Sequence, residues 1–407
     1  MSRRLRIAQV APPLEPVPPP AYGGTERVVG VLVEELDRRG HEVTTFAAGD
    51  STVPGRLVPT VSRALWPANY TGDTAPWFMS TIDAVLARAT EFDVIHSHLE
   101  WYSPLLARAA PVPVVTTFHG RLDLPWAATL LRRAAGSLVA ISRAHANTHP
   151  DAPWAAVIHN GLRLVESPFA QQPGDDLAFV GRIVPEKGIL DAIDVALRAG
   201  RRLRIAAKSG KTPAEREYLE NVFRPALAKA GPAVEFLGEL TRADRDTLLA
   251  SSAATLMPGD WPEPFGLVAI ESLACGTPVV ARPVGALPEI VRHGIDGRFA
   301  SDVPGFVAAV DGIAALDRAA IRRSVLERFS ADRMTDAYET LFLRAMGQTR
   351  GPEPVDARFP VGPGRPAASR PPIRVSVSAE ARDRELPDGP SPVAAAPVAA
   401  TGRPATD

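Results

Sequence analysis

Cysteine is nearly absent from this chain of 407 residues, in which Cys275 is the only one. One thiol can form neither a disulfide framework nor a thiolate-rich metal site, which excludes disulfide-stapled secreted scaffolds and cysteine-based zinc domains. The lack of disulfides agrees with a reducing compartment, and we expect the protein to be cytoplasmic.

Charge of one sign is also lacking, because 45 lysine and arginine residues face 46 acidic residues and leave a formal net charge of -1 at pH 7. This balance argues against a nucleic-acid partner. Long hydrophobic runs are missing too, so we expect no integral membrane segment. Prolines end the first apolar run too early for a signal peptide.

Several motifs of familiar enzyme classes are missing. The sequence has no Gly-x-Ser-x-Gly elbow, no Walker loop, and no Gly-x-Gly-x-x-Gly directly after a strand. These absences argue against serine hydrolases, P-loop nucleotide hydrolases and dinucleotide-dependent oxidoreductases. Lysine is rare as well, with only four residues, so each lysine merits individual attention.

What the sequence does contain is a regular alternation of strand-like and helical segments. Apolar residues at helical spacing follow the run Leu5–Val10, and a strand-like run resumes at His41–Ala48. Further strand-like segments are Asp93–His96, Val112–Phe118, Ser137–Ile141 and Ala155–Ile158. This alternation predicts a parallel sheet with helices on both faces.

A second series begins after a stretch rich in proline, glycine and glutamine. Its strand-like segments are Leu177–Val180, Leu203–Ala207, Val234–Leu237, Ala254–Met257 and Pro278–Ala281. The predicted fold class is α/β, with two doubly wound, Rossmann-like domains at residues 1–168 and 176–330 facing each other across a cleft. Residues 331–347 carry helical spacing, and the Pro/Ala-rich tail 348–407 has too few large apolar residues to fold, so we predict disorder there.

One segment of the second series carries two carboxylates eight positions apart. Prolines on both sides keep Glu263 out of a helix, whereas helical spacing begins at Phe265 and places Glu271 in the second turn. Free N–H groups at such a helix start, here near Phe265, Gly266 and Leu267, can hold a phosphate. An acid on each side of a phosphate site suggests a ligand with sugar hydroxyls.

Two cations leave the end of the first strand-like segment of the second series. Arg182 and Lys187 stand five positions apart and can reach one anion, so they could stabilise a departing diphosphate without a metal. The alternative is a solvated turn in which Glu186 is their partner.

A glycine pair and a histidine mark two loops of the first series. Gly23 and Gly24 open a helix, for which Thr25 is the expected N-cap, and they allow an anion to approach the backbone; a flexible turn is the alternative. His119 follows a strand-like segment at the cleft edge. An imidazole there can hydrogen-bond a sugar hydroxyl or serve a structural purpose.

Two other groups could hold a metal, and we favour other roles for both. His96 and His98 share a strand face, but no third ligand has matching spacing, so an acceptor-side or structural role is preferred. Asp244 and Asp246 follow Thr241 in the pattern of a helix start, where acids serve the positive end of the helix.

These residues together resemble family 4 retaining glycosyltransferases of GT-B fold, over nearly all of residues 5–346. The strings AQVAPPLEPVPPPAYGGTERVV, TTFHGRLDLP and WPEPFGLVAIESLACGTPVVA are similar to a bacterial subgroup of that family. This subgroup includes an avilamycin-pathway transferase and the UDP-glucose:tetrahydrobiopterin glucosyltransferases.

The resemblance implies a role for each site residue. Arg182 and Lys187 would hold the donor diphosphate, helped by the Gly23–Gly24 loop and by the N–H groups near Phe265–Leu267. Glu271 would bind the donor ribose. Glu263 would bind the transferred sugar, and His119 would contact it from the opposing domain. Same-face attack, with the leaving phosphate accepting the proton, would retain the anomeric configuration. The helix in 331–347 would return to the first domain.

We therefore expect a transferase that moves a hexose, with glucose as the expected sugar and UDP as the expected nucleotide, to a hydroxyl of a small-molecule or lipid-linked acceptor. No metal or other cofactor is expected. The alternatives are a nucleotide-sugar epimerase of the same architecture and a non-catalytic sugar-nucleotide binding protein. First-domain aromatics, namely Trp101, Tyr102 and Trp126, could stack on the acceptor or belong to the core.

Overall fold

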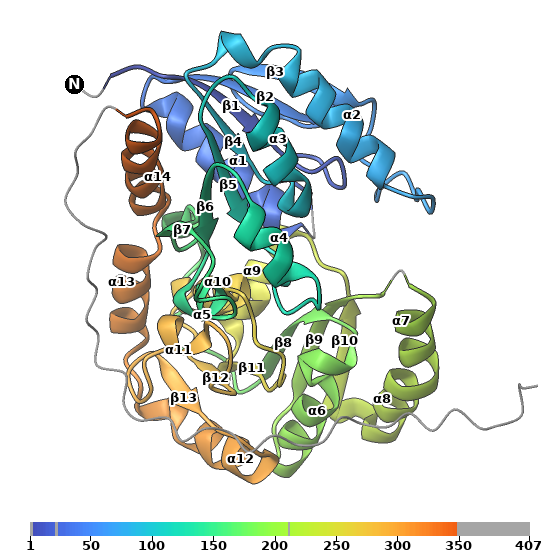
Figure 1. The fold of residues 1–407 in the computed structure, drawn as a ribbon. Helices are drawn as coiled ribbons and strands as arrows, with labels where there is room; N and C mark the ends of the chain where they lie inside the picture. Colours follow the sequence, from blue (N-terminus) through green and yellow to red (C-terminus); the bar gives the residue numbers. More distant parts are fainter. Residues whose placement is uncertain (1–2, 21–22, 211, 348–407) are drawn as a thin grey trace, which may run out of the picture. The chain divides into compact units, whose positions relative to one another are not determined.

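The structure is a computed structural model that describes residues 3–20, 23–210 and 212–347; the predicted tail 348–407 lies outside the described residues. Two sheets with flanking helices make up this part of the chain (Figure 1). The strand orders are β3-β2-β1-β4-β5-β6-β7 and β10-β9-β8-β11-β12-β13, and neighbouring strands pair in parallel. The predicted fold class is confirmed.

The first sheet contains seven strands, which are β1 Arg6–Val10, β2 Glu42–Ala48, β3 Arg56–Val61, β4 Val94–Ser97, β5 Val114–Phe118, β6 Ser137–Ala140 and β7 Trp154–Val157. Its helices are α1 Gly24–Arg38, α2 Ala75–Leu86, α3 Ser103–Ala109, α4 Ala127–Arg133 and α5 Arg143–Asn147. Successive strand residues face opposite sides, since Ile7 packs in the core with Leu32 of α1 while Ala8 packs in the core with Phe78 of α2.

The second sheet contains β8 Leu177–Arg182, β9 Leu203–Lys208, β10 Val234–Gly238, β11 Ala254–Met257, β12 Val279–Ala281 and β13 Gly297–Phe299. The helices that follow in the chain are α6 Ile189–Arg198, α7 Pro213–Tyr218, α8 Arg224–Ala230, α9 Arg242–Ser251, α10 Leu267–Ala274, α11 Leu287–Ile290, α12 Val303–Asp311, α13 Arg318–Arg328 and α14 Ala331–Ala345. Helix α14 packs against α1 and β5 of the first sheet, where the Tyr338 hydroxyl lies 2.9 Å from Oγ1 of Thr117.

Two edge strands, β3 and β13, were not predicted. Strand β3 is only half buried and contains Pro59, and β13 has three residues, so neither presents the apolar run of a central strand. In the part of the chain that the structure describes, no helix is long and apolar enough to cross a bilayer.

The order of strands reverses at the same place in both sheets, between β1 and β4 in the first and between β8 and β11 in the second. Loops that leave the carboxyl ends of such neighbouring strands turn in opposite directions and open a crevice. The crevice of each sheet is therefore where ligand groups are expected.

Candidate functional site

A cleft of about 450 Å³ lies at these strand ends and is lined from both sheets. The predicted site residues on its wall are Gly23, Gly24, His119, Arg182, Lys187, Glu263, Phe265, Gly266, Leu267 and Glu271. Every residue that the sequence selected for the site thus reaches one cavity, which has the size of a small-molecule site.

Helix α10 begins inside this cleft. It starts at Leu267, two residues later than the helical spacing suggested, because Gly266 adopts φ 102° and ends the preceding loop. No side chain caps the helix, so the first N–H groups remain directed at the cleft. Glu263 precedes the helix and Glu271 lies in its second turn, so an acid stands on each side of the helix start.

Helix α1 begins in the same way, with a correction to its predicted cap. Gly23 is the N-cap, with φ 149°, and Thr25 falls inside the first turn. A Cβ atom on Gly23 would lie 2.8 Å from Cβ of Pro19, so this position requires glycine. The glycine at position 23 is thus explained by the packing of Pro19, and both glycines line the cleft.

Both predicted cations are paired with acids. The Lys187 ammonium contacts the Glu263 carboxylate. The guanidinium of Arg182 donates to Glu215 at 2.9 Å and lies 3.7 Å from Glu186. Glu186 was the partner expected if this turn were only a solvated turn. Arg182 and Lys187 both line the cleft, however, so the turn forms part of the cleft wall.

The Glu271 carboxylate is held by two arginines that were not predicted. Arg27 of α1 contacts its Oε1 atom, and Arg245 of α9 donates to the same oxygen at 3.0 Å. Burial and the neighbouring Arg245 charge lower the pKa of Arg27 to about 9. Two guanidinium groups around one carboxylate hold Glu271 in place between the two sheets.

His119 lies just beyond β5 and belongs to a hydrogen-bonded row of side chains. Its Nε2 atom shares a hydrogen bond with Nδ1 of His98 at 2.9 Å, and Nε2 of His98 lies 3.2 Å from Oε1 of Gln9. Burial, helped by the His145 charge, lowers the pKa of His119 to about 3, so the imidazole is neutral at physiological pH.

The two groups that resembled metal ligands have other partners. His98 uses both ring nitrogens as described above, and Nε2 of His96 lies 2.8 Å from Oγ1 of Thr117. Thr241 caps α9 by accepting from the Asp244 N–H, as predicted. Within residues 3–20, 23–210 and 212–347, no three His, Cys, Asp or Glu side chains gather as a metal site.

Two carboxylates on the first-domain wall of the cleft, Glu26 and Glu100, were not predicted. Burial raises the pKa of Glu26 to about 8 and that of Glu100 to about 7. Their positions in the sequence could have identified them, because Glu26 follows the glycine pair and Glu100 follows the end of strand β4. Both therefore occupy the same kind of position as the residues that were selected.

The aromatic residues proposed for the acceptor do not line the cleft. Trp101 packs between Phe118 and Trp126, and Tyr102 stacks on Phe78 with ring centroids 4.5 Å apart. The aromatic side chains on the first-domain wall are Trp66 and Phe78 instead.

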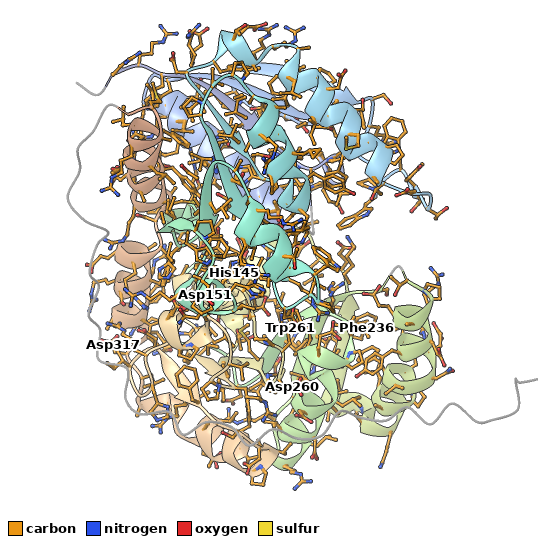
Figure 2. All side chains as sticks on the ribbon, viewed as in Figure 1. His145, Asp151, Phe236, Asp260, Trp261 and Asp317 are labelled. Carbon is orange, nitrogen blue, oxygen red and sulfur yellow. The ribbon has the colours of Figure 1, made fainter. Side chains whose placement is uncertain are left out.

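Contacts around the cleft tie the loop before α10 to the first domain. Trp261, labelled in Figure 2, lies beneath the guanidinium of Arg121, whose Cζ atom is 4.6 Å from the ring centroid. The Ser142 hydroxyl donates to the Pro264 carbonyl at 2.7 Å. The loop that carries Glu263 is thereby fixed between the sheets.

With this geometry in place, comparison with known proteins identifies the family. The model described as Glycosyltransferase Family 4 matches residues 22–165, and the model described as Glycosyl transferases group 1 matches residues 174–315. Together they span well over half of the chain. The chain belongs to glycosyltransferase family 4. Membership confirms the predicted glycosyltransferase and its use of a nucleotide sugar.

Named relatives of this glycosyltransferase include enzymes with different acceptors. A glycogen synthase of Mycobacterium tuberculosis is 29% identical over 411 residues, which cover 84% of this chain and 96% of the relative. A D-inositol 3-phosphate glycosyltransferase of Mycobacterium leprae is 37% identical over 187 residues, or 43% of this chain and 42% of the relative.

A solved structure supports the fold. AviGT4, a glycosyltransferase involved in avilamycin A biosynthesis, is 26% identical with a TM-score of 0.64, and the match covers 85% of this chain and 99% of that chain. This similarity agrees with the subgroup suggested by the three sequence strings.

Proposed function

We propose that this glycosyltransferase moves glucose from UDP-glucose to a hydroxyl acceptor with retention of anomeric configuration and without a metal. One observation carries the proposal: two cations, Arg182 and Lys187, line the same cleft as the start of helix α10. Such an arrangement suits a diphosphate, because cations and oriented N–H groups stabilise the charge that develops on a leaving phosphate.

When the donor binds, Lys187 would exchange its ion-pair partner Glu263 for the donor diphosphate. The Lys187 ammonium contacts the Glu263 carboxylate. A diphosphate that reaches the start of α10 offers Lys187 a stronger anionic partner, which releases the Glu263 carboxylate to accept hydrogen bonds from the hydroxyls of the transferred sugar. The ion pair thus keeps both groups in place until the donor arrives.

Glu271 is suited to the donor ribose. Arg27 and Arg245 both contact its Oε1 atom, so Oε2 can accept from ribose hydroxyls. Because the two arginines come from helices α1 and α9 beside different sheets, Glu271 connects the ribose site to both domains.

The chemical step needs no protein nucleophile in this proposal. The C–O bond from the sugar anomeric carbon to the diphosphate breaks, the acceptor oxygen attacks from the same face, and the leaving phosphate oxygen takes the acceptor proton. The neutral imidazole of His119 would hydrogen-bond a sugar hydroxyl from the first-domain side. The choice of UDP as the nucleotide and glucose as the sugar of the donor rests on the resemblance described above.

A release assay tests the proposal. UDP release would be measured with UDP-glucose, UDP-galactose, ADP-glucose and GDP-mannose, each with and without EDTA, and the anomeric configuration of the product would be read by NMR. We expect slow UDP release from UDP-glucose, unaffected by EDTA. Preference for another donor, loss of activity in EDTA, or an inverted product would each contradict the corresponding part of the proposal.

A further inference from the structure

The first-domain wall of the cleft differs in charge from the donor wall. Among the described residues, this wall carries two acids, Glu26 and Glu100, and one arginine, Arg27. The Arg27 guanidinium is already matched by Glu271, and His119 is neutral. The ionisable groups that remain on this wall are the carboxyls of Glu26 and Glu100.

Glu100 has one oxygen that accepts from backbone N–H groups and one that has no hydrogen-bond partner. Its Oε1 atom accepts from the N–H groups of His119 and Gly120 at 2.9 and 3.0 Å. Its Oε2 atom is buried and has no hydrogen-bond partner in the described residues. A buried carboxyl oxygen without a donor is costly, and a ligand that donates an N–H or O–H removes that cost.

The backbone of Glu100 agrees with a functional constraint. It has φ 52°, and Asn69 is the other non-glycine residue with positive φ among the described residues. Such a conformation is unfavourable for a side chain with a Cβ atom and persists where the surroundings demand it. Here it turns the carboxyl back toward the loop that carries His119.

Glu26 lines the same cleft wall from the first turn of α1. It is 4% exposed, and its Oε2 atom lies close to the backbone of Gly23 at the glycine pair. Burial raises its pKa, and the charges of Glu15 and Glu100 add to this effect. Lys208 reaches this region from β9, but it lies 3.5 Å from Glu15 and 3.7 Å from Glu239, so its charge is matched.

We propose that Glu100 and Glu26 select an acceptor that carries no phosphate or carboxylate and that donates N–H or O–H groups to them, such as an amino compound or a polyol. Trp66 and Phe78 on the same wall provide room for an apolar face of this acceptor. The proposal rests on the transferase function proposed above and names the class of its second substrate. Among the described residues of this wall no cation is left to pair with a phosphate or carboxylate, which disfavours an anionic acceptor.

An acceptor panel in matched pairs tests the proposal. The full chain would be supplied with UDP-glucose and with glucosamine or glucosamine 6-phosphate, glucose or glucose 6-phosphate, and inositol or D-inositol 3-phosphate, and UDP release above donor hydrolysis would be measured. We expect kcat/KM for the unphosphorylated partner to exceed that of its phosphate ester by tenfold or more. Phosphate esters that serve equally well, or a panel in which no unphosphorylated compound stimulates release, would overturn the proposal.

The variant Glu100→Gln separates ligand selection from loop support. Its side-chain oxygen can still accept from His119 and Gly120, while the group at the Oε2 position becomes a donor. We expect the acceptor KM to rise tenfold or more for the best compound of the panel and the preference against phosphate esters to shrink. A purely structural role would lower kcat for all acceptors and leave their ranking unchanged.

Two further measurements distinguish a failure of the acceptor proposal from a failure of the proposed function. Glu26→Gln should shift the preference in the same direction, whereas Glu42→Gln, an exposed acid on β2 outside this cleft, should not. Calorimetry with UDP reports on the donor site alone. Absence of UDP binding would reject the proposed function, whereas normal UDP binding with a preference for phosphate esters would reject only the acceptor class.

Discussion

The Nδ1 atom of His98 lies 2.9 Å from the Nε2 atom of His119, so a side chain from the end of β4 orients one that follows β5. Both imidazoles are neutral, because burial lowers the pKa of His98 well below its usual range and that of His119 to about 3. A neutral, oriented imidazole can exchange hydrogen bonds with a sugar without titrating between pH 5 and 8.

Replacement of His119 by alanine is expected to lower kcat/KM roughly 100-fold, the usual cost of removing one hydrogen-bonding group from a transition state. The pH–rate profile of the wild type should show no inflection near pH 6.5 that is caused by His119. Steady-state rates from pH 5 to 8 check both points, and a His119-dependent break near pH 6.5 would contradict the neutral imidazole.

Replacement of Lys187 by alanine should weaken UDP binding about 10- to 100-fold, because a charge-assisted hydrogen bond to phosphate contributes about 1.5–3 kcal/mol. Calorimetry measures this change. Lys229→Ala is the matched control, since Lys229 is exposed on α8 and does not line the cleft. Equal UDP affinity in the two variants would remove Lys187 from the diphosphate site.

Replacement of Glu263 by glutamine should separate binding from catalysis. The ammonium of Lys187 loses its carboxylate partner and becomes available to the diphosphate, so UDP binding should be unchanged or a few times tighter. At the same time kcat should fall roughly 100-fold, because the transferred sugar loses a charged acceptor of hydrogen bonds. A loss of UDP affinity as large as in Lys187→Ala would contradict the exchange of partners.

Glu26 gives the folded protein a stability that depends on pH. Burial raises its pKa to about 8 from 4.5, so between these values the folded protein keeps a proton that the unfolded chain releases. The free energy of unfolding therefore falls as pH rises through this window, by at most about 1.4 kcal/mol per pH unit for one group. Glu26→Gln should become more stable relative to wild type as pH rises from 5 to 8. Urea unfolding at several pH values checks this, and a constant difference would contradict it.

Tyr338 joins α14 to the first sheet through Thr117. Its hydroxyl is buried and lies 2.9 Å from Oγ1 of Thr117, which also contacts His96. Tyr338→Phe should lower the free energy of unfolding by about 1–2 kcal/mol, the cost of a lost buried hydrogen bond. UDP affinity should remain unchanged, because Tyr338 does not line the cleft. Denaturant unfolding and calorimetry measure the two effects, and an unchanged stability would show that the contact contributes nothing.

The sequence by itself determined the fold class and many of the residues that line the cleft. Parallel strands buried on both faces leave continuous apolar runs, and ligand groups of such sheets follow strand ends, so Arg182, Lys187 and His119 could be selected from position alone. Glu263 and Glu271 could be selected because prolines and helical spacing are local signals. The edge strands β3 and β13 escaped prediction because they are short or only half buried.

The tertiary structure alone decided which charges meet. Arg27 pairs with Glu271 and Lys187 with Glu263 across long stretches of sequence, and Glu100 is set against the loop after β5 with one oxygen unpaired. Such contacts depend on how two sheets approach each other, which no local pattern of residues encodes. The raised pKa values of Glu26 and Glu100 have the same origin, since burial is a property of the packed cleft.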